Sequence, residues 1–129
     1  MNGNQLLNNT LRVNALFSFL SGLDFILCDR AIMDIVTGKS GGGLWPTGAM
    51  LIGFSIFVFW VSRLKNVNKY LVGSIIAMDI TWIVGSATIV IALGSLLTGI
   101  GYFLIVFVAA IIGMFAYFQT KGLRRHLAA

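Results

Sequence analysis

The sequence has very few charged or thiol side chains. Only 10% of its 129 residues are charged, and glutamate is absent. Soluble domains usually carry about 25% charged residues. A single cysteine, Cys28, excludes an internal disulfide, a CxxC redox pair and a cysteine-ligated zinc site. The composition therefore argues against an ordinary soluble domain and against a dithiol oxidoreductase.

Histidine is equally scarce, because His126 near the C-terminus is the only one. One histidine cannot supply the two axial ligands of a b-type haem, and it leaves no histidine-built metal site. It also leaves no imidazole base beside a nucleophile in the apolar part of the chain. We therefore expect no cofactor, no metal site and no catalytic residues, which argues against an enzyme.

Apolar residues are what the chain has in excess. They make up 58% of the sequence, more than one core of this size could bury, so lipid is the expected solvent. A membrane span must satisfy its own backbone hydrogen bonds, which favours helices over strands. We predict an all-α fold, a single integral membrane domain over residues 1–129 that forms a four-transmembrane-helix bundle. The apolar runs of near-spanning length are about 11–28, 46–62, 70–93 and 98–120.

Local signals refine the predicted helices. We expect the first run to be a retained helix and not a signal peptide, because Arg12 is its first basic residue and no small-residue cleavage pattern follows. The polar residues 8–10 could cap it, and Pro46 suits the first turn of the second helix. Residues 29–36 (DRAIMDIV) are predicted to form a short amphipathic helix at the membrane interface.

Basic residues set the expected orientation. With four crossings, all but two of them fall on one side of the membrane, and only Arg30 and Lys39 lie on the other. The positive-inside rule then places both termini in the cytoplasm, with the chain in the cell inner (cytoplasmic) membrane. Six of these residues are also expected to anchor the bundle on anionic lipid headgroups, so the net charge of +5 points to lipid and not to nucleic acid. The expected anchors are Arg63, Lys65, Lys69, Lys121, Arg124 and Arg125.

Asp79 is the only charged residue between Lys69 and Lys121. An acid at the centre of a membrane helix costs about 2.5–3.5 kcal/mol on translocon scales. The nine residues from Tyr70 to Asp79, at about 1.5 Å each, put it about 14 Å deep, near the midplane. Two interpretations stay open. Asp79 binds a proton or a cation, or its carboxyl is a structural group that hydrogen-bonds neighbouring helices.

Other polar residues are expected at a similar depth. On the first helix, Asn14, Ser18 and Ser21 recur at helical spacing, with Cys28 further along nearly the same face, and such a stripe faces other helices because lipid offers it no partners. Asp24 lies nearer the outer end, where a pair with Arg30 or headgroup water explains it more simply. The candidate site, either a proton or cation site or a polar link between helices, consists of Asp79, Ser18, Ser21, Ser55, Ser86 and Asp24.

Small residues mark the expected packing surfaces, because they let helix backbones approach closely. Ala49 and Gly53 form one pair, and Ala109 and Gly113 form another. The third helix carries a stripe on the side opposite Asp79, which is either buried or presented to a partner chain, so a homo-oligomer or a larger membrane complex is expected. This stripe consists of Ser74, Ala77, Thr81, Thr88 and Ala92.

Two segments, 11–22 (LRVNALFSFLSG) and 77–86 (AMDITWIVGS), resemble small four-helix integral membrane proteins of bacteria. In size and helix count the chain is also similar to the DoxX-type proteins. The resemblance implies a bacterial cytoplasmic membrane and no particular activity, and it assigns no functional residue.

Two functions are compatible with these observations. The expected one is a non-enzymatic membrane protein acting by helix–helix association, as an accessory or assembly subunit or as a self-associating bundle. The alternative is a small proton- or cation-coupled transporter or channel that uses Asp79.

Overall fold

The structure, a computed structural model, describes residues 3–39, 41 and 43–128. Within these ranges the chain is helical and contains no strand, which confirms the predicted all-α fold. The elements are α1 (Gly3–Leu27), α2 (Asp29–Thr37), α3 (Trp45–Ser62), α4 (Lys69–Leu93), the 3-10 turn η1 (Gly94–Leu96) and α5 (Gly99–Ala128).

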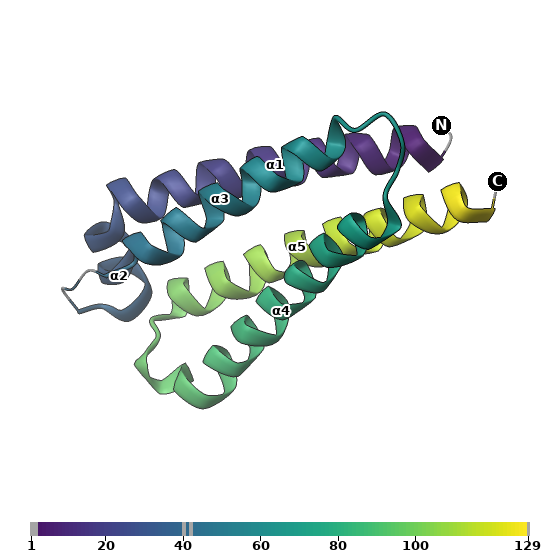
Figure 1. The fold of residues 1–129 in the computed structure, drawn as a ribbon. Helices are drawn as coiled ribbons and strands as arrows, with labels where there is room; N and C mark the ends of the chain where they lie inside the picture. The colour runs from purple at the N-terminus through teal and green to yellow at the C-terminus, as the bar shows by residue number, and fades with distance from the viewer. Residues whose placement is uncertain (1–2, 40, 42, 129) are drawn as a thin grey trace.

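Four of these helices, α1, α3, α4 and α5, are long and apolar enough to cross a membrane, as predicted. Figure 1 shows that both termini and the α3–α4 connection lie at one end of the molecule. The short helix α2 and the α4–α5 connection lie at the other end. The candidate spans are Gln5–Leu27, Trp45–Ser62, Lys69–Leu96 and Gly99–Ala128.

The first and last spanning helices extend beyond the predicted apolar runs. α1 begins at Gly3 and α5 continues to Ala128, and the added turns pack together: Leu7 is fully buried, and a Cβ on Gly122 would lie 2.9 Å from the Cβ of Leu7. The polar residues 8–10 therefore lie inside α1, and the prediction that they cap it was wrong. Pro46 does lie in the first turn of α3, as predicted.

The spanning helices form two pairs, α1 with α3 and α4 with α5, joined by contacts between α1 and α5. α3 and α4 hardly touch. The two pairs lie close together near the termini and spread apart toward α2 (Figure 1). The main apolar core contains Leu7, Leu11 and Ala15 of α1, Val58 and Val61 of α3, and Val72 and Ile75 of α4.

A glycine pair brings α1 and α3 into close contact. A Cβ on Gly22 would lie 2.7 Å from the carbonyl oxygen of Gly48, and a Cβ on Gly48 would lie 2.6 Å from that of Gly22. No side chain fits at either position without a backbone shift. The neighbouring pair named from the sequence, Ala49 and Gly53, is exposed on α3. The α1–α3 contact thus uses the glycine one residue before Ala49.

The short helix α2 is tied to the start of α5. The Thr98 amide N–H donates to the Val36 carbonyl at 2.8 Å, and the Thr98 hydroxyl donates to the Ile35 carbonyl at 2.6 Å. These bonds satisfy carbonyls that the end of a helix leaves unpaired. Gly101 packs so closely against the Val36 backbone that a Cβ has no room there. The position of α2 at the membrane interface stays a prediction.

Candidate functional site

Asp79 lies in a ring of buried polar side chains that links three helices. The Asn14 amide of α1 donates to Asp79 Oδ2 at 3.0 Å, and the Gln119 amide of α5 donates to the same oxygen at 2.8 Å. Asn14 also donates to Gln119 Oε1 at 2.9 Å. We call these residues the Asn14–Asp79–Gln119 network. Each of the three side chains contacts the other two, so α1, α4 and α5 are joined at one level.

The network is enclosed and well satisfied. Asn14, Asp79 and Gln119 are 1%, 4% and 0% exposed. Ser18, one turn along α1, donates its hydroxyl to Asn14 Oδ1 at 3.1 Å. In the described part of the chain, every fully buried side-chain nitrogen or oxygen has a hydrogen-bond partner. Interhelical hydrogen bonds of this kind favour association of helices in lipid, where water cannot replace them.

Helical periodicity explains how these residues meet. Asn14 and Ser18 lie with Leu7, Leu11 and Ala15 on the buried face of α1. Asp79 continues the buried face of α4 after Val72 and Ile75. Gln119 follows the buried Ile112, Phe115 and Ala116 on α5.

Gln119 was not among the predicted site residues, because it stands beside Thr120 and Lys121, where polar residues usually mark the end of a membrane helix. Its spacing from Ile112 and Phe115 was the signal that could have found it.

The network lies nearer the basic end of the bundle than the position of Asp79 in its own helix indicated. Asn14 follows Arg12 by two residues, and Gln119 precedes Lys121 by two, a rise of only about 3 Å in each helix. Arg12 is exposed. The groups that contact the carboxyl of Asp79 are the side-chain amides of Asn14 and Gln119, not a cation.

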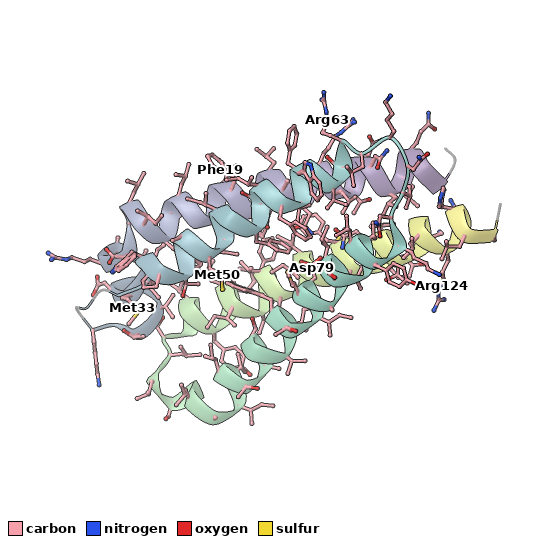
Figure 2. The ribbon with its side chains drawn as sticks, in the orientation of Figure 1. Phe19, Met33, Met50, Arg63, Asp79 and Arg124 are labelled. Carbon is pink, nitrogen blue, oxygen red and sulfur yellow. The ribbon has the colours of Figure 1, made fainter. Side chains whose placement is uncertain are left out.

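A cleft of about 800 Å³ opens between α3 and α4, and Asp79 is one of its lining residues. α3 and α4 supply its walls, while Ser18 of α1 and Ile112 of α5 contribute from behind. Figure 2 shows Met50 of α3 and Asp79 of α4 between the two helix pairs. Both network bonds to Asp79 end on Oδ2. Its other carboxyl oxygen, Oδ1, accepts no hydrogen bond from the described residues.

The remaining candidate site residues are dispersed. Ser86 is half-buried and lines the same cleft. Ser55 is buried, but its hydroxyl donates to the Ile52 carbonyl of its own helix at 2.6 Å. Ser21 is half-buried, and Asp24 is exposed. The structure therefore joins Ser18 to Asp79 through Asn14, and it places Ser21, Ser55 and Asp24 outside the network.

Two of the three predicted packing residues of α4, Ser74 and Ala77, do not line the cleft, whereas Thr81 does. Ser74, Ala77 and Thr81 are exposed, and the hydroxyls of Ser74 and Thr81 donate to carbonyls of their own helix. On α5, Ala109 and Gly113 are half-buried, and a Cβ on Gly113 would lie 3.8 Å from Ile83 of α4, an ordinary contact. The role of the exposed residues in helix packing stays a prediction.

The predicted headgroup anchors gather at the end that holds the termini. Five of them are exposed and Lys121 is half-buried. Figure 2 shows Arg63 and Arg124 at this end. The charged groups of Arg63, Lys69 and Lys121 lie 5.9, 5.1 and 5.9 Å from the ring centroids of Phe59, Tyr70 and Tyr117. Long basic side chains beside aromatic rings are typical of membrane–water boundaries. The exposed anchors are Arg63, Lys65, Lys69, Arg124 and Arg125.

Comparison with known proteins identifies no relative. No family model matches the chain, and no curated protein or solved structure matches it. The described residues also contain no group of three or more His, Cys, Asp or Glu side chains that could hold a metal ion. The function is therefore argued from the geometry alone.

Proposed function

We propose that this chain is a non-enzymatic integral membrane protein that acts by helix–helix association, and that its first partner is a second copy of itself. In this proposal it resides in the cell inner (cytoplasmic) membrane with both termini in the cytoplasm. The concentration of basic residues at the end that holds the termini supports that orientation.

The exposure of α4 carries the proposal. Only Val72, Ile75 and Asp79 are buried in this helix of 25 residues. Its outward face is not uniformly large and apolar, as a surface facing only lipid would be. It carries the stripe of Ser74, Ala77, Thr81, Thr88 and Ala92, all exposed and all on the side opposite Asp79. Small residues let the backbone of another membrane helix approach closely, which increases van der Waals contact.

A bulky residue in the stripe should weaken self-association. The test compares Ala77→Leu with Ala87→Leu, since both alanines are exposed on α4 and the same atoms are added. At about 100° per residue, position 77 lies about 160° from Asp79 around the helix, and position 87 only about 80°. We expect the wild type and Ala87→Leu to form oligomers in lipid bilayers, counted by subunit photobleaching, and Ala77→Leu to dissociate at a mole fraction at least tenfold higher.

Two results would contradict self-association. One is a wild type that stays monomeric at every protein-to-lipid ratio. The other is an equal effect of the two leucines, which would mean that the stripe is not the contact surface.

A second function, proton- or cation-coupled transport, is favoured by one observation: Asp79 lines the cleft with Oδ1 uncommitted. Asp79→Asn should then abolish pH-dependent flux in liposomes while leaving folding and oligomeric state unchanged. A wild type that moves none of the tested ions would remove the support for transport.

A further inference from the structure

The geometry points to a binding site for a lipophilic ammonium ion in the cleft between α3 and α4. The ligand class is an amine that carries a positive charge and at least one N–H, together with an aromatic or branched apolar group. The site lies within one copy of the chain, so it goes beyond self-association and does not depend on it.

The size and lining of the cleft fit such a molecule. Small-molecule sites usually enclose about 300–1,000 Å³ of mostly apolar space, and this cleft encloses about 800 Å³. Phe54 and Phe57 of α3 and Trp82 of α4 line it with aromatic rings. Aromatic faces attract cations as well as apolar groups. From Asp79 to Ile89 the lined stretch of α4 is about 15 Å long, enough for a ligand with two or three rings.

The charged residues that line the cleft indicate that its ligand is a cation. Asp79 is the only acidic residue that lines it, and no Lys or Arg lines it. Oδ2 already accepts two hydrogen bonds from the network, whereas Oδ1 accepts none from the described residues. Asp79 is 4% exposed and lines the cleft, and two amides hold its carboxyl, so it is a buried polar residue with one carboxyl oxygen that accepts no hydrogen bond from the described residues.

An ammonium ion fits this oxygen better than the alternatives. A lipid tail would fill apolar space but would leave Oδ1 without a donor, and a buried polar atom without a partner is unfavourable. A neutral alcohol would supply a donor but not the opposite charge. An ammonium N–H supplies both, and hydrogen bonds between charged partners are about twice as strong as neutral ones.

Access from the membrane is direct. α3 and α4 hardly touch, and the two helix pairs spread apart toward α2 (Figure 1). In this proposal the cleft between α3 and α4 is therefore open to the surrounding lipid. Lipophilic amines partition into bilayers, so the ligand reaches the cleft from lipid without any rearrangement of the helices.

The test uses two probes of the same shape, 2-naphthylethylammonium and the neutral 2-naphthylethanol. Binding is measured by equilibrium dialysis against the protein in nanodiscs of zwitterionic phosphatidylcholine, with protein-free discs subtracted. We expect saturable binding of one ammonium per chain and at least tenfold weaker binding of the alcohol. Asp79→Asn keeps an acceptor oxygen for Asn14 and Gln119 but loses the charge, and it should weaken ammonium binding at least tenfold. Asp24→Asn, at an exposed acid of α1, should leave it unchanged.

A cleft-filling variant keeps Asp79 and tests the site independently. Gly53 lines the cleft, and a Cβ added there would meet no atom within 4 Å. Gly53→Leu should therefore fold normally and weaken ammonium binding at least tenfold. Gly73→Leu is the matched control, because Gly73 also has open space around it but lies outside the cleft.

The proposal is overturned by any of four results. These are equal affinity for the ammonium and the alcohol, full binding by Asp79→Asn, full binding by Gly53→Leu, and no saturable binding above protein-free discs. None of them bears on Ala77→Leu, which tests self-association, because Ala77 does not line the cleft.

Discussion

Replacing Asp79 by leucine should loosen the bundle where α1, α4 and α5 meet. Leucine accepts no hydrogen bond, so the bonds from Asn14 and Gln119 to Oδ2 are lost. Side-chain hydrogen bonds between membrane helices contribute about 0.6 kcal/mol each on average, which gives about 1 kcal/mol for the two. Asn14 can still donate to Gln119 Oε1. The buried Nε2 amide of Gln119, in contrast, loses the acceptor to which it donates, Asp79 Oδ2. An unsatisfied buried donor costs about 2 kcal/mol, so the expected destabilisation is about 3 kcal/mol.

Asparagine at the same position should be far milder. Its amide oxygen can take the place of Oδ2 and accept both bonds, and its size is nearly that of aspartate. We expect Asp79→Asn to lower the free energy of unfolding by no more than about 0.5 kcal/mol. Ser55→Ala is the control for loss of a buried hydroxyl, because Ser55 bonds only to its own helix, and its effect should also stay within about 0.5 kcal/mol.

The assay is equilibrium unfolding in mixed micelles with increasing denaturing detergent, followed by tryptophan fluorescence and far-ultraviolet circular dichroism. A double-mutant cycle with Gln119→Leu isolates the direct interaction, and its coupling energy should be about 1 kcal/mol. If Asp79→Leu unfolds at the wild-type midpoint, or if the two leucine substitutions are additive within about 0.3 kcal/mol, Asp79 and Gln119 do not interact and the network is refuted.

Two further substitutions test the packing that positions the network and the cleft. Gly48→Ala places a Cβ 2.6 Å from a carbonyl oxygen of α1 and should destabilise the fold by about 2 kcal/mol in the same assay. The control Gly53→Ala adds a Cβ in open space and should be neutral or slightly stabilising. Equal effects of the two substitutions would contradict the close α1–α3 contact. Thr98→Val removes the hydroxyl that donates to the Ile35 carbonyl and should speed amide hydrogen exchange in α2 severalfold. The control Thr88→Val removes a hydroxyl that bonds within its own helix and should leave exchange in α2 unchanged. Unchanged exchange in Thr98→Val would mean that the Thr98 hydroxyl does not hold α2.

The fold was predictable because lipid leaves few choices. A chain with four apolar runs must form helices there, since an unsatisfied backbone group in hydrocarbon is costly. The helix ends were less predictable. Hydropathy falls at polar residues such as Asn9 and Thr120, which suggests that the helices end there. α1 and α5 nevertheless extend past these residues, because Leu7 packs against Gly122. A helix ends where its packing ends, and hydropathy does not report packing.

The site was predictable in part for a related reason. Counting residues gives the depth of a side chain along its helix, and depth alone grouped Ser55 with Asp79. The network depends instead on which helix faces meet, and lipid is as apolar as leucine, so hydropathy cannot distinguish a face that meets a helix from one that meets lipid. Asn14 and Ser18 were found because their spacing marks one face. Gln119 could have been assigned to the network only with knowledge of how α5 packs against α1 and α4.

In the proposed site, the two carboxyl oxygens of Asp79 have different roles, one structural and one ligand-binding. Oδ2 accepts the bonds that join α1, α4 and α5, while Oδ1 accepts none from the described residues and is the atom that the proposal assigns to the ligand. The structural role supports binding, because two amides from different helices fix the carboxyl at the cleft wall and a ligand need not order it. The division of roles also lets folding and ligand binding be measured separately, because Asp79→Asn keeps an acceptor for both amides and removes only the charge. A variant that folds like the wild type but no longer binds an ammonium ion would show that one side chain serves both roles.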